Sequence, residues 1–95
     1  MDLKELQQYR LKINELAKQY HSHNVRVFGY VGKNENTENS DIDFLIDPDP
    51  EQDLFDVIRL RGSLRELLNY VVDIVLSTAL HYTVRQEILT SAILL

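Results

Sequence analysis

Two aspartates, Asp41 and Asp43, lie one residue apart at the start of an apolar run, and Asp73 lies inside a later one. Side chains two positions apart on a strand point to the same face, roughly 6.6 Å apart at about 3.3 Å per residue. If the two runs are neighbouring strands, all three carboxylates can meet on that face. Their mutual repulsion, on the order of 4 kcal/mol for two unit charges about 4 Å apart, is removed by a divalent ion. Oxygen-only ligands favour magnesium or manganese, so the pattern predicts a metal site at these three residues.

Each acid taken alone has a simpler interpretation. An Asp-x-Asp pair at a strand edge can be a solvated turn, and Asp73 can be the salt-bridge partner of an arginine. The nearly continuous apolar run from Tyr70 to Leu76 predicts a strand that is buried on both faces. A charge inside such a strand needs compensation, and this favours the metal site over the simpler interpretations.

A glycine precedes the acid pair within the strand-like run 25–31. Gly29 lets backbone N–H groups approach a phosphate with no side chain between them. Lys33, in the polar loop 33–40, can supply a positive charge to a triphosphate. Phosphates that magnesium bridges to carboxylates are typical of phosphoryl and nucleotidyl transfer.

The elements that must position these residues are expected in the order αββαβα. A helical apolar stripe predicts a helix from residue 2 to about 20, and strands are expected over 25–31, 42–46 and 70–76. Strands covered by helices imply an α/β (α+β) fold, a small mixed β-sheet flanked by helices.

The second helix carries the clearest boundary signals. Asp49 is its expected N-cap, with Pro50 as first helical residue and Gln52 completing a capping box. Gly62 weakens its middle by about 1 kcal/mol relative to Ala and can split it, while Asn69 is the expected left-handed terminator. The residues expected on its buried side are Leu54, Phe55, Ile58, Leu64, Leu67 and Leu68. A last helix is expected to start at Thr83, with Gln86 as its capping-box partner.

Composition narrows the class of protein. The 95 residues predict one domain over 1–95, and 44% hydrophobic with 26% charged residues is typical of a soluble globular chain. The absence of cysteine excludes disulfides and thiolate zinc sites, and the net charge of −5 argues against duplex DNA as a partner. The N-terminus is not a signal peptide and no run is long enough to span a membrane, which predicts a cytoplasmic protein. His21 and His23 are interpreted as part of a polar connector, because no third metal ligand is near.

Together these residues resemble the minimal nucleotidyltransferase (MNT) family of the polymerase-β-like nucleotidyltransferase superfamily. The family pattern is a hydrophobic residue, Gly-Ser, a polar spacer and Asp-x-Asp. Here it reads Phe28-Gly29-Tyr30, ten residues, then Asp41-Ile42-Asp43, with Ser40 also matching. The third acid of the family fits Val72-Asp73-Ile74-Val75. The resemblance extends over nearly the whole chain, including the helix at 85–89.

This resemblance implies a function. The chain is similar to the antitoxins of HEPN–MNT (type VII) toxin–antitoxin pairs, protein adenylyltransferases that move AMP from ATP onto a tyrosine of the HEPN toxin, an RNA-cutting partner. By the resemblance, Asp41 and Asp43 would hold two magnesium ions and the ATP phosphates. Asp73 would ligate the catalytic metal and help activate the incoming hydroxyl, while Gly29 and Tyr30 would cradle the phosphates.

Two residues depart from the family pattern. Tyr30 stands where the family has Ser, and Lys33 replaces the usual loop arginine, which keeps the charge but loses the bidentate fork. Tyr30 leaves open an alternative, an MNT-fold antitoxin that neutralises its toxin by binding alone. Nucleotide transfer to a small molecule is a weaker alternative, because relatives of that kind carry an added substrate domain. The apolar end, Ser91 to Leu95, is expected to pack on the chain's own core, with a partner surface as the alternative.

Overall fold

The computed structural model describes residues 1–28 and 41–95, so Gly29, Tyr30, Lys33 and Ser40 lie outside the described residues. The helices are α1 (Leu3–Gln7), α2 (Arg10–Gln19), α3 (Leu54–Leu68) and α4 (Tyr82–Ser91), with a short 3₁₀ helix η1 (Ser77–Ala79). The strands are β1 (Ser22–Phe28), β2 (Ile42–Pro48), β3 (Val72–Leu76) and β4 (Ile93–Leu94). No helix in these described ranges is long and apolar enough to cross a membrane.

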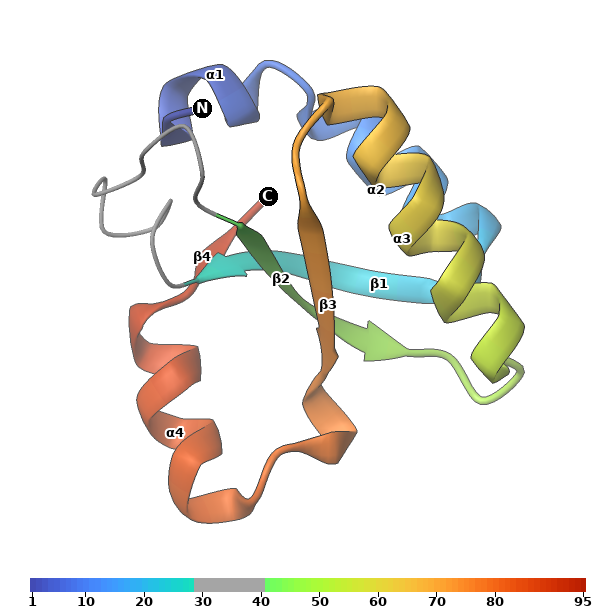
Figure 1. The fold of residues 1–95 in the computed structure, drawn as a ribbon. Coiled ribbons are helices and arrows are strands. Elements are labelled where there is room, and N and C mark those ends of the chain that lie inside the picture. Colours follow the sequence, from blue (N-terminus) through green and yellow to red (C-terminus); the bar gives the residue numbers. More distant parts are fainter. Residues whose placement is uncertain (29–40) are drawn as a thin grey trace.

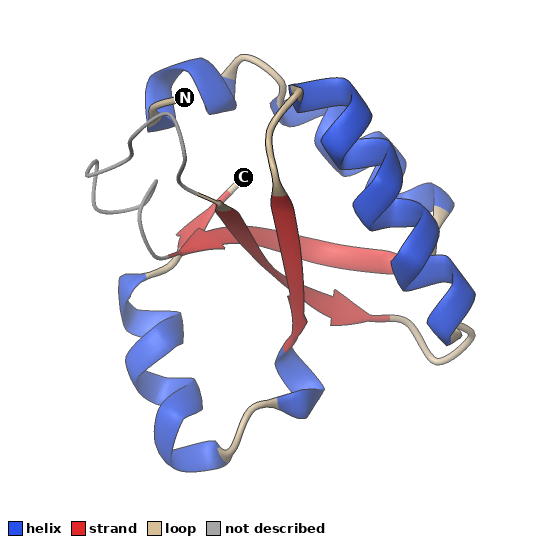
Figure 2. Cartoon of the chain, in the orientation of Figure 1, coloured by secondary structure: helices blue, strands red, loops and turns tan. Residues whose placement is uncertain are grey.

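The four strands form one mixed sheet in the order β3-β2-β1-β4. β2 and β3 are parallel, whereas β1 pairs antiparallel with both β2 and β4. In Figures 1 and 2, α2 and α3 lie together on one side, and α4 lies apart from them with the sheet between. The expected mixed sheet flanked by helices is therefore confirmed, with one strand more than the sequence predicts.

The core lies between the sheet and the helices α2 and α3. Strand alternation sends Ile42, Phe44 and Ile46 into it, each at most 1% exposed, where they join Ile13 and Leu60. The odd-numbered positions of β2 therefore face the other side of the sheet. That face is covered at Leu45, which is fully buried, and opens toward Asp43.

The prediction that the third strand is buried on both faces is wrong. β3 is an edge strand, Val72 is its one fully buried residue, and Val71 just before it is 51% exposed. The physical reason is position: β3 has a hydrogen-bonded neighbour on one side only, and its face that carries Asp73, whose side chain is 45% exposed, remains open. An apolar run alone does not distinguish a strand that is covered on both faces from an edge strand that is covered on one.

The helix starts also differ from the predictions. The N-terminal helix is divided at Gln8 and Tyr9 into α1 and α2. The N-cap of α3 is Asp53 and not Asp49: Asp53 Oδ1 accepts a hydrogen bond from Asp56 N at 2.8 Å, and Asp53 N donates to Asp56 Oδ2 at 3.1 Å. Gln52 instead donates its side-chain amide to Tyr20 O at 3.0 Å and so ties the turn to the end of α2.

The later helix boundaries follow the sequence more closely. Gly62 does not split α3, and Asn69 ends it in the left-handed conformation with φ of 56°, as predicted. The start of α4 is one residue earlier than predicted, with His81 as N-cap accepting from Thr83 N.

Half of the expected buried side of α3 is exposed. Leu64 and Leu68 are buried and Leu67 packs against the core, but Leu54, Phe55 and Ile58 are 70%, 63% and 55% exposed. The N-terminal half of α3 therefore presents an apolar surface outward.

The apolar C-terminal segment packs on the chain's own core, as expected. Ile93 pairs with Val27 of β1, and Leu95 N donates to Val25 O at 2.9 Å. Leu95 also packs against the core cluster, whereas Leu94 is 63% exposed.

Candidate active site

Asp43 and Asp73 lie directly opposite each other on neighbouring strands. The parallel register of β2 and β3 pairs them, flanked by the pairs Ile42 with Val72 and Phe44 with Ile74. Paired residues of adjacent strands project from the same face, and their backbones are about 4.8 Å apart. The two acids were expected to meet if their strands are neighbours, and Asp43 and Asp73 fulfil this condition.

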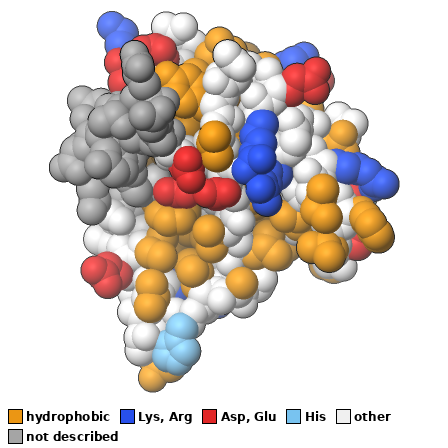
Figure 3. Space-filling model, in the orientation of Figure 1, with side chains coloured by type: hydrophobic (Ala, Val, Ile, Leu, Met, Phe, Trp, Pro, Cys, Tyr) orange, Lys and Arg blue, Asp and Glu red, His pale blue; other side chains and the backbone are white. Residues whose placement is uncertain are grey.

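Asp41 comes immediately before β2 and is exposed. The next residue, Ile42, donates its N–H to Val71 O at 2.9 Å, which anchors the chain at the entrance of the β2–β3 ladder. In Figure 3 acidic side chains gather near the middle of the open face. Asp41 is therefore at the entrance of the strand on which Asp43 lies.

The three carboxylates influence one another electrostatically. Burial raises the pKa of Asp43, and the negative charges of Asp73 and Asp41 raise it further. A carboxylate in this position favours any cation that offsets those charges.

The donor set fits a hard divalent cation such as Mg²⁺, because it consists of carboxylate oxygens. Within the two described ranges, no three His, Cys, Asp or Glu side chains are already arranged to hold a metal ion. The expected meeting of all three carboxylates at one ion is therefore not preformed there. The facing pair of Asp43 and Asp73 would hold the cation, with Asp41 beside them as the next carboxylate within reach.

Arg65 is a site residue that the search for acids did not identify. Its Nε donates to Val72 O at 3.1 Å, and its Nη2 lies 3.8 Å from Asp73 Oδ1. Both side chains remain well exposed, at 38% and 45%, so the ion pair is weak and offsets only part of the local negative charge. Asp73 therefore has the arginine partner that the simpler interpretation expects. This ion pair exists in addition to the pairing of Asp73 with Asp43. A signal existed: Arg65 lies in the last turn of α3, and the connection to β3 is too short to carry that turn away from the strand.

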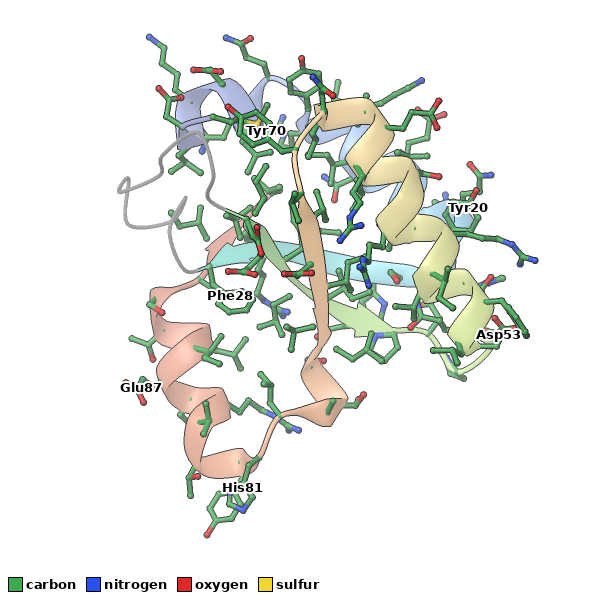
Figure 4. All side chains as sticks on the ribbon, viewed as in Figure 1. Tyr20, Phe28, Asp53, Tyr70, His81 and Glu87 are labelled. Carbon is green, nitrogen blue, oxygen red and sulfur yellow. The ribbon has the colours of Figure 1, made fainter. Side chains whose placement is uncertain are left out.

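Phe28 borders the acids on the other side. It is the last residue of β1 and pairs with Asp43, so its half-buried side chain shares the acidic face (Figure 4). The chain continues from Phe28 directly into the glycine loop. The backbone that leads into the expected phosphate cradle therefore starts next to Asp43.

A fourth acid on the same strand has a structural role. Asp47 binds Arg26 through two hydrogen bonds of 3.2 and 3.1 Å and accepts another from Asn24 at 2.8 Å. Burial alone would raise its pKa, but the hydrogen bonds from Arg26, Ser77 and Asn24 outweigh burial and hold it well below the usual range. Asp47 is compensated by Arg26 and Asn24, whereas within residues 1–28 and 41–95 Asp43 has no such cationic partner.

The two candidate histidines are also paired locally. His21 Nδ1 lies 3.1 Å from Asp56 Oδ2, and His23 Nδ1 lies 2.6 Å from Asp49 Oδ1. Each has one carboxylate neighbour among the described residues. His21 lies in the turn before β1, but His23 lies within β1 and pairs with Asp47, so the expected polar connector is correct for His21 alone.

Residues 11–95 match the family described as polymerase beta, nucleotidyltransferase. Two candidate protein adenylyltransferases of Methanocaldococcus jannaschii are similar in sequence. MJ0435 is 34% identical over 70% of this chain and 72% of its own length. MJ0126 is 37% identical over 70% of this chain and 68% of its own length.

Solved structures share the fold. A candidate minimal nucleotidyltransferase superposes with a TM-score of 0.91 at 37% identity, over all of this chain and 97% of the other. A toxin–antitoxin structure with AMP-PNP has a TM-score of 0.75 at 22% identity, over 90% of this chain and 70% of the other. An MNT antitoxin in complex with the tri-AMPylated HEPN toxin of Shewanella oneidensis has a TM-score of 0.68 at 20% identity, over 93% and 69%. At these identities the last two establish the fold alone.

Proposed function

This chain belongs to the polymerase β nucleotidyltransferase family, and from this premise we propose that it is a magnesium-dependent protein adenylyltransferase, the antitoxin of a HEPN-family toxin. It transfers AMP from ATP to a tyrosine of that toxin and thereby neutralises it. The observation that carries the proposal is the register that sets Asp43 opposite Asp73, where burial and neighbouring charge raise the pKa of Asp43. The relatives named as protein adenylyltransferases and the toxin–antitoxin fold neighbours support the choice of reaction and partner.

In the proposed reaction the tyrosine hydroxyl oxygen attacks the α-phosphorus of ATP. The bond from that phosphorus to the α–β bridging oxygen breaks, pyrophosphate leaves, and Asp73 accepts the hydroxyl proton. Asp41, Asp43 and Asp73 would hold two magnesium ions, and Asp41 and Asp43 would through them orient the phosphates. When bound, the ions supply charge neutralisation of the phosphates and of the leaving group.

The glycine loop completes the proposed site. Gly29 and Tyr30 cradle the phosphates, Lys33 supplies positive charge, and Ser40 precedes the acid pair as in the family pattern. The reaction is placed in the cytoplasm, where ATP and a ribonuclease toxin meet, and the net charge of −5 makes DNA an unsuitable partner.

The test is the transfer of label from α-³²P-ATP, in the presence of magnesium, to a HEPN protein whose gene is adjacent to the gene of this protein. Wild type should label the partner, and mass spectrometry should find the added AMP on tyrosine. Asp43→Asn should reduce labelling at least a hundredfold, while Glu66→Gln, an exposed acid on α3, should leave it unchanged. If wild type leaves its cognate partner unlabelled, the proposal is wrong.

Tyr30 supports a second candidate, an antitoxin that neutralises by binding alone. A tyrosine ring in place of a small serine hydroxyl changes the space available to a phosphate. This candidate predicts that Asp41→Asn plus Asp43→Asn still protects cells from the toxin. If the double variant binds the toxin but no longer protects, binding alone is excluded.

A further inference from the structure

The outward side of α3 carries an apolar surface that the fold leaves uncovered. Leu54, Phe55 and Ile58 follow helical spacing and are all more than half exposed. Arg59 lies over the Phe55 ring, with its guanidinium carbon 5.9 Å from the ring centroid. Contiguous exposed apolar residues on a small domain commonly mark an interaction surface.

A hollow with a volume of about 310 Å³ continues this surface along the helix. Ile58, Arg61, Gly62 and Arg65 line it. A Cβ added at Gly62 would meet nothing within 4 Å, so the glycine leaves the floor of the hollow open. Arg61 has no ion pair or hydrogen bond within residues 1–28 and 41–95. The hollow is therefore a cationic site in a chain whose net charge is −5.

The hollow is continuous with the candidate active site. Arg65 lines it and also lies 3.8 Å from Asp73, and Figure 3 shows basic side chains next to the acidic ones. The sheet order puts β3 on one side of β2 and β1 on the other. Phe28 at the end of β1 pairs with Asp43, so the hollow lies on the opposite side of the acid pair from Phe28, beside Asp73, the proposed acceptor of the hydroxyl proton.

We propose that this hollow docks the protein substrate by binding a carboxylate side chain close to the acceptor tyrosine. The inference rests on the proposed function and adds the chemistry that selects the target segment. Arg61 and Arg65 match a carboxylate in charge, and the guanidinium of Arg61, which has no partner within the described residues, can bind a carboxylate through two hydrogen bonds. An apolar side chain of the same segment packs on Ile58 and Phe55, which gives the mixed apolar and arginine contact that is typical of interaction hot spots.

Binding is tested without catalysis, with three fluorescent peptides that each contain a single tyrosine. Their flanking residues are Leu and Glu, Leu and Gln, or Leu and Lys, and fluorescence anisotropy with the full chain gives the Kd. The Glu peptide should bind at least tenfold more tightly than the Gln peptide, and the Lys peptide most weakly. Equal affinity for the Glu and Gln peptides overturns the proposal.

Two variants locate the binding to the hollow. Arg61→Glu should weaken the Glu peptide at least tenfold, and Phe55→Ser should weaken all three peptides; both positions are exposed, so the fold should persist. Arg10→Glu, the same charge change at an exposed position on α2, is the matched control. A loss with Arg10→Glu as large as that with Arg61→Glu overturns the proposal, because it reports net charge alone.

Kinetics with the HEPN partner separate the protein side of the site from the nucleotide side. Arg61→Glu should raise KM for the partner with KM for ATP unchanged, and a rise confined to ATP would assign the hollow to nucleotide phosphates and overturn the proposal. Asp43→Asn should abolish AMP transfer and keep the peptide preference. If wild type transfers no AMP but the peptide preference holds, the proposed function fails while the docking site stands.

Discussion

At the scale of single residues, Asp43 and Asp47 show how neighbouring positions on one strand acquire different roles. Both project from the acidic face of β2, four residues apart. Arg26 and Asn24 satisfy Asp47, whereas Asp43 faces a second carboxylate, Asp73. The described part of the chain stabilises the charge of Asp47 and offers no cation to Asp43, which is the arrangement expected when a ligand supplies the missing charge.

Replacing Asp43 by Asn should stabilise the protein in the absence of ligand. The change removes a carboxylate whose ionised form is disfavoured by burial and by Asp73 and Asp41. A gain of about 0.5 kcal/mol corresponds to a rise in Tm of about 2–4 °C. Differential scanning calorimetry in EDTA measures it, and a lower Tm for Asp43→Asn would contradict the electrostatic account.

In the same variant, Asp43→Asn, Mg²⁺-ATP should no longer stabilise the fold. For wild type, ligand at about a hundred times its Kd should stabilise the fold by about 2.7 kcal/mol. Glu66→Gln, which removes an exposed charge from α3, should keep the full response. A rise in Tm on addition of Mg²⁺-ATP that is equal in wild type and Asp43→Asn would show that the ligand binds elsewhere.

Asp47→Asn should destabilise the fold by about 1 kcal/mol at pH 7, the upper range for a partly exposed ion pair. The pKa of Asp47 is lowered on folding, so its contribution is complete above about pH 4 and is lost as the pH falls below that value. The difference between wild type and variant should therefore shrink in acid. Urea unfolding at pH 7, 5 and 3 measures it; a difference that grows toward pH 3 would contradict the sign.

The sequence identified the acid pair from local spacing, because strand alternation alone puts Asp41 and Asp43 on one side. The search for acids did not identify Arg65, although the short connection between α3 and β3 indicates that the last turn of α3 lies near Asp73. The burial argument for Asp73 was wrong because an apolar run does not reveal an edge strand. The sequence made the meeting of Asp43 with Asp73 conditional on the two strands being neighbours, and the parallel register of β2 and β3 meets that condition.

At the scale of elements, two nearby acids, Asp49 and Asp53, are both suitable N-cap residues for α3. Asp49 precedes a proline, the pattern preferred at a helix start, but its backbone N–H is bonded to His21 O at 2.9 Å. The chain therefore turns once more, and Asp53 forms the capping box with Asp56. Local propensity is compatible with both positions, and the long-range hydrogen bond to His21, the residue before β1, favours Asp53.

Asp53→Ala should destabilise the fold by about 1 kcal/mol, because it removes the N-cap of a fifteen-residue helix. Asp49→Ala is the matched control and should cost less than about 0.5 kcal/mol, since it removes only an exposed contact with His23. Chemical denaturation followed by circular dichroism compares them. An equal loss in the two variants would show that the cap at Asp53 is unimportant.

Gly62→Ala should stabilise α3 by about 0.5–1 kcal/mol, the difference in helix propensity between the two residues. The position is exposed, and the added methyl group meets nothing within 4 Å. The same methyl group narrows the docking hollow, so the variant should gain stability and lose affinity for the Glu peptide. Thermal unfolding and anisotropy on one preparation check both effects, and a lower Tm would indicate an unseen contact at this position.

At the scale of the whole molecule, the sheet has a fourth strand because β1 needs a neighbour on its outer edge. β4 has two residues, too short for any periodic pattern, and pairs with Arg26 and Val27 near the C-terminal end of β1. Sequence reasoning predicted that the apolar end is buried, but not that it extends the sheet. The pairing covers an exposed strand edge, which otherwise favours association between chains.

Leu95→Ala should therefore destabilise the fold by about 1–2.5 kcal/mol, because Leu95 packs against the core while its N–H is held by Val25 O. Leu94→Ala, the same chemical change one residue earlier, is the matched control. Its side chain is 63% exposed, so the cost should stay below about 0.5 kcal/mol. Urea unfolding gives both values, and light scattering should show that Leu95→Ala associates more readily as β4 frays from the edge of β1. If Leu94→Ala proves the more destabilising of the two, the end of the chain packs on the sheet with the opposite face.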